Sequence, residues 1–264
     1  MTDWLNITKG AAPLIVSVPH AGIDIPAQIT GLRSAELARR DADHHVGKLY
    51  AFVRELGATL IETAISRSVI DVNRDPSGVS LYPGQVTTGL CPIETFSGEP
   101  LYSPGQEPNE EEIGRRRAQY FDPYHTALKT QIARLQSSHP AVVVYDAHSI
   151  RSHVPRLFEG ELPLFNIGSF SGASCAPALT EAVAEKCAGQ AHIINGRFKG
   201  GWITRHYGNP AGGVHAIQME LAMRGYLDED APWPPEWDPA RAAGLHTTLR
   251  TILNACLSFA KDQT

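Results

Sequence analysis

Short apolar runs alternate with helical stretches along the chain, and this alternation limits the possible folds more than any other feature. The clearest run, Ala141-Val-Val-Val-Tyr145, is continuous and β-branched, as parallel strands covered on both faces are. No break in composition and no repeat divides the pattern, so we expect one α/β domain over residues 1–264. It should hold a mostly parallel central sheet with helices on both faces. Further strands are predicted at 13–19, 58–65, 163–168, 192–195 and 214–221, with a shorter candidate at 68–72.

Four segments carry apolar residues at helical spacing. The first spans 34–56 and ends at Gly57, a residue typical of helix C-caps. The second spans 109–137, and Pro123 should kink or split it because proline lacks the backbone N–H. The other two are predicted at 176–188 and 241–260.

The composition excludes several classes of protein. Hydrophobic residues form 42% of the 264 residues and charged residues 19%, which argues against a disordered or coiled-coil chain. The net charge of -5 gives no electrostatic footprint for nucleic acid or an anionic membrane. No apolar run approaches the ~20 residues that a membrane span needs. Four cysteines without a Cys-x-x-Cys pair, and no visible signal peptide, predict a reduced cytoplasmic protein.

Histidines follow two of the predicted strands. His20 comes after the first strand, and Asp146-Ala-His148-Ser149 comes after Tyr145. Ligands of α/β sheets bind beyond the carboxyl ends of the strands, so both histidines could meet at a metal ion. The alternative is that each is an ordinary hydrogen-bonded loop histidine. The Asp-x-His step favours the metal site because it supplies a ligand and an orienting carboxylate together.

A catalytic zinc site needs a third protein ligand and keeps one position open for water. The stretch Asp41-Ala-Asp43-His44-His45 offers candidates. The two aspartates could instead cap a helix N-terminus, which would leave the adjacent histidines unexplained.

Glu220 lies inside the apolar strand predicted at 214–221. A buried carboxylate is costly unless it is paired or functional. Glu220 could therefore pair with an arginine, or act as a general base beside an activated water.

Arginines gather at the predicted loop edges, which suits the recognition of a carboxylate because guanidinium binds it through two hydrogen bonds. Some of these arginines are expected to be ordinary surface charge. The sequence contains no Gly-x-Gly-x-x-Gly or phosphate loop and no Gly-x-Ser-x-Gly motif, so nucleotide binding and serine hydrolysis have no support. The arginines in question are Arg67, Arg74, Arg151, Arg156, Arg197 and Arg205.

Several long strings together resemble the N-formylglutamate amidohydrolase family. The similarity runs from Val16-Ser-Val-Pro-His-Ala-Gly22 to Gln218-Met-Glu-Leu221. It implies a zinc-dependent phosphorylase/hydrolase-like fold and hydrolysis of N-formyl-L-glutamate to formate and glutamate, the last step of one route of histidine degradation. The most specific strings are Ser66-Arg-Ser-Val-Ile-Asp-Val-Asn-Arg-Asp-Pro76, Asp146-Ala-His-Ser-Ile-Arg151, Pro155-Arg-Leu-Phe-Glu-Gly160 and Gly196-Arg-Phe-Lys-Gly-Gly-Trp-Ile-Thr-Arg-His-Tyr207.

Carried over by position, the resemblance implies that His20, Asp43 and His148 bind zinc or another divalent ion. Relatives use glutamate as the acidic ligand, so His45 stays an alternative to Asp43. Glu220 falls on the catalytic glutamate, and Arg151 is expected to help stabilise the oxyanion.

The implied substrate carries two carboxylates, so we expect two cationic contacts. Arg67, Arg74 with Asn73, and Arg151 are the first choices for them, followed by Arg205 and His206. Arg74 is the first choice for the side-chain carboxylate.

Residues 73–106 are rich in Gly, Pro, Ser and Thr and are too long for an ordinary connection. We expect this loop to fold over the site and exclude water. Two other functions stay open: a zinc amidase acting on another N-acyl amino acid or on peptidoglycan, and a non-catalytic protein that binds a dicarboxylate.

Overall fold

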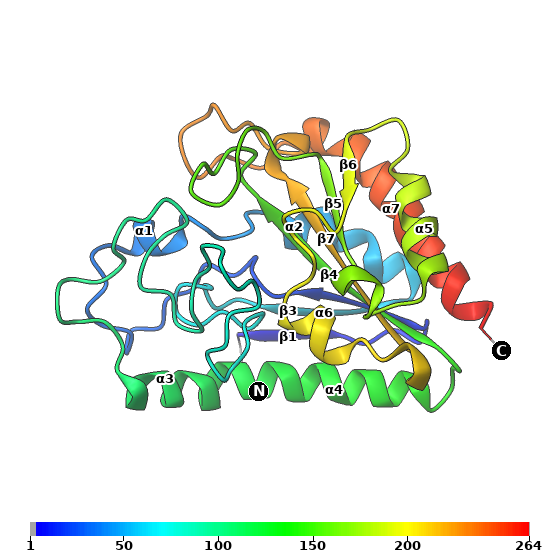
Figure 1. The fold of residues 1–264 in the computed structure, drawn as a ribbon, viewed down its shortest axis with the longest axis horizontal. Coiled ribbons are helices and arrows are strands. Elements are labelled where there is room, and N and C mark those ends of the chain that lie inside the picture. Colours follow the sequence, from blue (N-terminus) through cyan, green and yellow to red (C-terminus); the bar gives the residue numbers. More distant parts are fainter. Residues whose placement is uncertain (1–3, 264) are drawn as a thin grey trace.

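The computed structural model of the protein describes residues 4–263. These residues form a twisted central sheet of seven strands (Figure 1). Its strand order is β1-β3-β2-β4-β7-β5-β6. The pairs β2/β3, β2/β4, β4/β7 and β5/β6 are parallel, whereas β1/β3 and β5/β7 are antiparallel. The strands are β1 (Leu5–Thr8), β2 (Leu14–Val18), β3 (Thr59–Thr63), β4 (Val142–Ile150), β5 (Phe165–Gly168), β6 (His192–Ile194) and β7 (Val214–Ala222).

Helices cover both faces of the sheet. Leu14, Val16 and Val143 lie in a core with α2, α5 and α7, whereas Ile15 and Val144 face α4 and α6. Figure 1 shows α3 and α4 running along one side of the sheet and α5 against α7 on another. The prediction of a mostly parallel α/β sheet with helices on both faces is therefore confirmed. The helices are α1 (Ala35–Arg39), α2 (Val46–Leu49), α3 (Glu110–Arg116), α4 (Asp122–Gln136), α5 (Pro177–Lys186), α6 (Trp202–Tyr207) and α7 (Pro239–Lys261).

The helix predicted over 34–56 is broken, and that prediction is wrong in its middle. Helix α1 ends at Arg39, and α2 begins only at Val46. The turn between them contains a hydrogen bond from the Asp43 N–H to the His20 carbonyl, 2.9 Å long, and a left-handed His45 with φ of 62°. Burial of Asp43 against the end of β2 therefore overrides the helical pattern.

The strand considered at 68–72 is also wrong, because these residues form turns that Asp71 organises. The Asp71 carboxylate accepts a hydrogen bond from the Asn73 N–H and another from Arg67. Val69, Ile70 and Val72 still lie in the core, which explains the strand-like pattern. The sequence pattern did not predict the short strand β1 or the short helix α6.

The long helix predicted at 109–137 is interrupted next to Pro123, as expected. A π-helical turn, Arg117–Phe121, joins α3 to α4, and Pro123 lies in the first turn of α4. A proline is tolerated at that position because its missing N–H would have no helical partner there.

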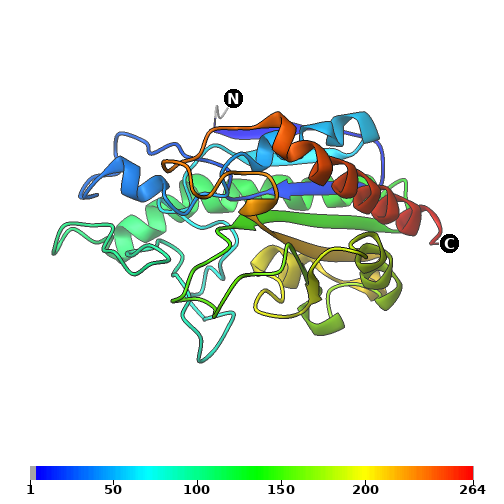
Figure 2. The same cartoon turned by 90° about the horizontal axis from the view of Figure 1, so that it is seen from above.

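The segment 73–106 has no regular helix or strand within the described residues. Figure 2 shows it as an irregular teal segment that extends beyond the arrowhead of β4. In residues 4–263, no helix has both the length and the apolar character that a membrane crossing would require.

Candidate active site

Polar side chains interrupt the apolar strands at one end of the sheet. Strands β4 and β7 pair in parallel, with Asp146 opposite Gln218 and His148 opposite Glu220. Residues two apart on a strand share a face, so these four side chains point to the α4 and α6 side. The strand was predicted to end at Tyr145, but β4 continues to Ile150 because β7 pairs with it over its whole length.

His20, Asp43 and His148 meet at this end of the sheet, and all three are buried. Their ligand atoms lie within 4.8 Å of one another. Asp43 Oδ2 is 3.1 Å from His148 Nδ1 and 3.8 Å from His20 Nδ1. His45 instead points to the Pro235 carbonyl, 3.0 Å away, so the structure brings Asp43 and not His45 to the two histidines.

Each of the two histidines has its own orienting carboxylate. His20 Nε2 lies 2.6 Å from Asp71 Oδ1, and His148 Nε2 lies 2.9 Å from Asp146 Oδ2. A carboxylate at Nε2 fixes the proton there and leaves Nδ1 free to bind a cation. Both Nδ1 atoms face Asp43.

The three residues fit a divalent metal ion. His20 Nδ1 is buried and has no hydrogen-bond partner among the described residues, although buried polar atoms are normally paired. Two imidazole nitrogens and one carboxylate oxygen are a donor set that zinc accepts at catalytic sites. The triad could therefore hold such an ion and leave a coordination position for water.

The pKa values of the triad follow from burial and from these charges. Burial and the nearby Arg67 lower the pKa of His20. Burial opposes charging of His148, but Asp146 and Asp43 outweigh it and raise its pKa well above the usual value. For Asp71, burial is likewise outweighed, and His20 and the arginines hold its pKa well below normal. Asp71 therefore stays charged beside His20.

Glu220 lies beside the triad with few hydrogen bonds of its own. Gln218 Nε2 donates to Glu220 Oε2 at 3.4 Å, and Gln218 Oε1 accepts the Gly201 N–H at 2.7 Å. Burial raises the pKa of Glu220 to about 8, against the opposing effect of His148. A carboxyl group whose pKa lies near neutrality can both accept and donate a proton.

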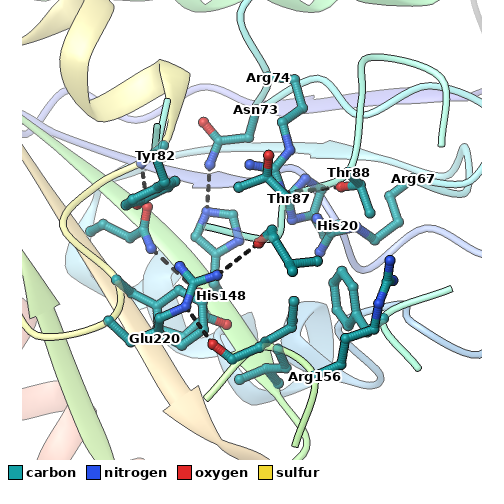
Figure 3. A pocket seen from close by; sticks show the side chains of 18 residues that line it. His20, Arg67, Asn73, Arg74, Tyr82, Thr87, Thr88, His148, Arg156 and Glu220 are labelled. Carbon is teal, nitrogen blue, oxygen red and sulfur yellow. Dashed lines mark hydrogen bonds between the residues drawn. The ribbon is translucent and has the colours of Figure 1, made fainter. Parts of the chain in front are cut away.

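Asn73 connects the triad to helix α6. Its Nδ2 donates to Asp146 Oδ2 at 2.8 Å, and its Oδ1 accepts the Ile203 N–H at 2.7 Å. Gly201 permits this contact, since a Cβ there would lie 2.5 Å from Asn73 Nδ2. Figure 3 shows Asn73 directly above His148.

A cavity of about 60 Å³ lies over His20, His148 and Glu220. We call His20, Asp43, His148 and Glu220 the floor of this site. We call the loop segment 77–96 its roof, because Tyr82, Val86, Thr87, Thr88 and Phe96 line the cavity (Figure 3).

Side chains tie the roof to the rest of the protein. Tyr82 Oη donates to the Gly200 carbonyl at 2.9 Å, and Arg74 Nη2 donates to Thr88 Oγ1 at 3.1 Å. The segment therefore lies over the site as expected, and its closure on a ligand stays a prediction.

The structure brings some of the predicted residues together and leaves others apart. Arg67, Asn73 and Arg74 line the cavity with His20, His148 and Glu220. Arg151 lies elsewhere, 3.1 Å from Asp41 and near the Trp233 ring. Arg205 and His206 are also absent from the cavity lining: Arg205 donates to the Gly200 carbonyl, and His206 stacks on Trp202.

Two residues of the site, Asp71 and Gln218, had no predicted role, and Arg156 and Arg197 had been named only among the loop-edge arginines that could recognise a carboxylate. Asp71 carried the same signal as Glu220, a carboxylate inside an apolar run. The two arginines lay in the strings that carried the resemblance, but nothing in their local sequence separated them from surface arginines.

The chain is similar to several known proteins. A sequence model described as N-formylglutamate amidohydrolase matches residues 12–227. The N-formylglutamate deformylases of Pseudomonas aeruginosa and Pseudomonas putida are each 43% identical to the chain over 267 residues, covering 100% of it and 99% of their own length. The solved N-formylglutamate amidohydrolase of Ralstonia eutropha JMP134 has the same fold, with a TM-score of 0.79, 24% identity and 97% of each chain covered.

Proposed function

The chain belongs to the N-formylglutamate amidohydrolase family, and from this premise we propose that it hydrolyses N-formyl-L-glutamate to formate and L-glutamate. One observation carries the proposal. Two carboxylate-oriented histidines, an aspartate and a glutamate with a raised pKa converge under a cavity that arginines line. This arrangement suits the hydrolysis of an amide in an anionic substrate.

The reaction as we propose it depends on a divalent ion, zinc or another, held by His20, Asp43 and His148. When bound, such an ion supplies Lewis-acid polarisation of the amide carbonyl and of the attacking water. Asp71 and Asp146 hold the two imidazoles in the orientation that this binding needs.

Glu220 moves the protons of the reaction. It accepts the proton of the attacking water and then delivers it to the leaving amine nitrogen, which converts the amine into a good leaving group. Burial raises the pKa of Glu220 above that of an ordinary carboxyl group, so the protonated form that donates to the amine is accessible.

The arginines of the cavity bind the carboxylates of the substrate. Arg74 is linked to the floor, because its Nε lies 3.4 Å from Asp71 Oδ2 and Asp71 contacts His20. The roof covers the bound molecule and limits the water around the reacting atoms. The partner of this protein is therefore a small dicarboxylate, and we propose no role with nucleic acid or membranes.

We propose that this reaction is the last step of one route of histidine degradation, as the family resemblance implies, and that it takes place in the cytoplasm. A panel of N-formyl and N-acetyl amino acids, assayed for release of the free acid, tests the proposal. We expect N-formyl-L-glutamate to give the highest kcat/KM. A higher value for an N-acetyl or an uncharged N-formyl amino acid would move the function to another N-acyl amino acid amidase.

A further inference from the structure

The arginines that line the cavity differ in how their charge is balanced. Arg67 pairs with Asp71 at 2.7 Å, Arg74 contacts the same carboxylate, and Arg156 pairs with Glu94. Arg197 has no carboxylate partner among residues 4–263. It is the cavity arginine whose charge the described protein leaves unbalanced.

Backbone carbonyls and aromatic rings hold Arg197 in place. Its Nε donates to the Leu157 carbonyl at 2.7 Å, and its Nη2 donates to the Val86 carbonyl at 3.0 Å. The guanidinium lies 5.4 Å from the ring centroids of Tyr82 and Phe198. Its Nη1 donates to no residue of the described chain.

This environment fixes the guanidinium without neutralising it. Burial lowers the pKa of Arg197, and the charge of Arg74 lowers it further. Carbonyl oxygens satisfy two N–H groups but carry no full negative charge, so a carboxylate ligand would gain a strong charge-assisted contact here. An arginine fixed in this way also loses little freedom on binding.

The position of Arg197 separates it from Arg74. Arg74 connects through Asp71 to His20, and so lies next to the atoms that would hold the reacting amide. Arg197 is tied to Val86, which is exposed on the roof. In N-formylglutamate the α-carboxylate is attached to the carbon that bears the amide nitrogen, whereas the side-chain carboxylate lies two methylenes farther away.

We propose that Arg197 binds the side-chain carboxylate of the substrate and makes the enzyme selective for an acidic amino acid, while Arg74 serves the α-carboxylate. This inference rests on the proposed function and deepens it. It replaces Arg74, our first choice from the sequence, at the side-chain end.

Kinetics with two substrates test the assignment. N-Formylglutamine has the shape of N-formylglutamate but an uncharged side chain. Arg197→Met keeps the length and the apolar stacking of the side chain, and should lower kcat/KM for N-formylglutamate by about 30-fold or more. The loss for N-formylglutamine should stay below about threefold. Arg197→Lys should be more active on N-formylglutamate than Arg197→Met, because lysine keeps the positive charge. It should stay below the wild type, because lysine lacks the paired N–H donors of the guanidinium.

Matched variants distinguish this from a structural role. Arg224→Met removes a partly buried arginine that pairs with Glu161 outside the cavity, and should leave both substrates unaffected. Equal losses on both substrates for Arg197→Met would show that it only holds the roof, and would overturn the proposal. A loss specific to N-formylglutamate in Arg205→Met, without one in Arg197→Met, would overturn it too.

Binding without reaction separates this inference from the proposed function. Glutarate has two carboxylates and no amide to cleave, and glutaramate replaces one carboxylate by an amide. Calorimetry on the protein as purified should show glutarate binding more tightly, and Arg197→Met should remove the difference. If Arg197→Met removes the difference between the two ligands but N-formylglutamate is not cleaved, the proposed function is wrong and the role of Arg197 in carboxylate binding is supported. If cleavage occurs while Arg197→Met leaves the difference intact, the inference fails and the function stands.

Discussion

The floor and the roof of the cavity are built in different ways. His20, Asp43, His148 and Glu220 are at most 7% exposed, whereas Val86 of the roof is 40% exposed. The floor residues lie in or beside paired strands. The part of the roof around Val86 instead depends on single hydrogen bonds from side chains such as Tyr82 and Arg197.

This difference assigns different tasks to the two regions. Groups that do chemistry must be held within a fraction of an ångström, and packed strands with a second layer of hydrogen bonds provide that. A cover must open for each turnover, so it is drawn from segments of low local stability. Changes in the floor should therefore abolish the reaction, and changes in the roof should alter binding.

The largest effect is expected for Glu220→Gln, which keeps the shape of the side chain but cannot accept a proton. We expect kcat to fall about 10²–10⁴-fold. The bound metal should stay, because Glu220 is not one of its ligands. Formate release and elemental analysis on the same preparation check both points.

Glu62→Gln is the matched control, because Glu62 is a partly buried strand carboxylate outside the cavity. It should behave as the wild type. A Glu220→Gln variant with near-normal kcat would remove Glu220 from the mechanism.

The next effect concerns Asp71, which is fully buried and contacts His20, Arg67 and the Asn73 N–H. Asp71→Asn should weaken metal binding about 10–100-fold, because His20 loses its orienting carboxylate. It should also lower the free energy of unfolding by about 3–5 kcal/mol, since a buried arginine loses its partner.

Competition with a chelating dye measures the metal affinity, and urea unfolding measures the stability. Asp75→Asn, in the loop nearby, should change neither quantity. Unchanged metal affinity in Asp71→Asn would show that metal binding does not depend on the Asp71 carboxylate that orients His20.

The stability of the protein is expected to depend on pH through His125, a partly buried histidine of helix α4. His125 Nε2 lies 2.8 Å from the Val72 carbonyl, and burial lowers the pKa of His125 to about 4. Between pH ~6.5 and ~4 the unfolded chain therefore takes up a proton that the folded chain does not. The full contribution of His125 to the free energy of unfolding is therefore present above pH ~6.5. This contribution falls by about 3 kcal/mol as the pH drops to ~4.

Urea unfolding at several pH values checks this prediction. His125→Gln cannot titrate, so its stability should depend less on pH in that window, whereas His192→Gln, at an exposed position, should keep the wild-type dependence. An identical pH dependence in His125→Gln and the wild type would contradict the assignment.

The smallest effect is expected in the roof. Tyr82→Phe removes the hydroxyl that donates to the Gly200 carbonyl, worth about 1 kcal/mol. We expect KM for N-formylglutamate to rise less than about tenfold with kcat unchanged. Hydrogen exchange in residues 77–96 should become faster. A fall in kcat with normal KM would mean that the roof takes part in the chemistry.

The sequence predicts those features of the fold that depend on neighbours in the chain. Strands β2 and β7 and helices α5 and α7 lie close to their predicted ranges, because apolar spacing alone defines them. His20 and His148 were found because each follows or continues a core strand.

Features that depend on distant partners were not predictable in this way. The extension of β4 to Ile150 comes from pairing with β7, and the turn at Asp43 comes from its contact with His20. Arg197 meets Val86 across 111 positions in the sequence, so no local pattern distinguishes it from Arg205.

Metal content and activity, measured on the same preparations, show whether the hydrolysis depends on an ion held by His20, Asp43 and His148. We expect about one divalent ion per chain in the wild type, together with formate release from N-formylglutamate. Chelation should abolish that release, and the metal should restore it. Asp43→Ala should lack both the metal and the activity. Full activity in chelated protein that retains no divalent ion would show that the enzyme does not need a metal for this hydrolysis.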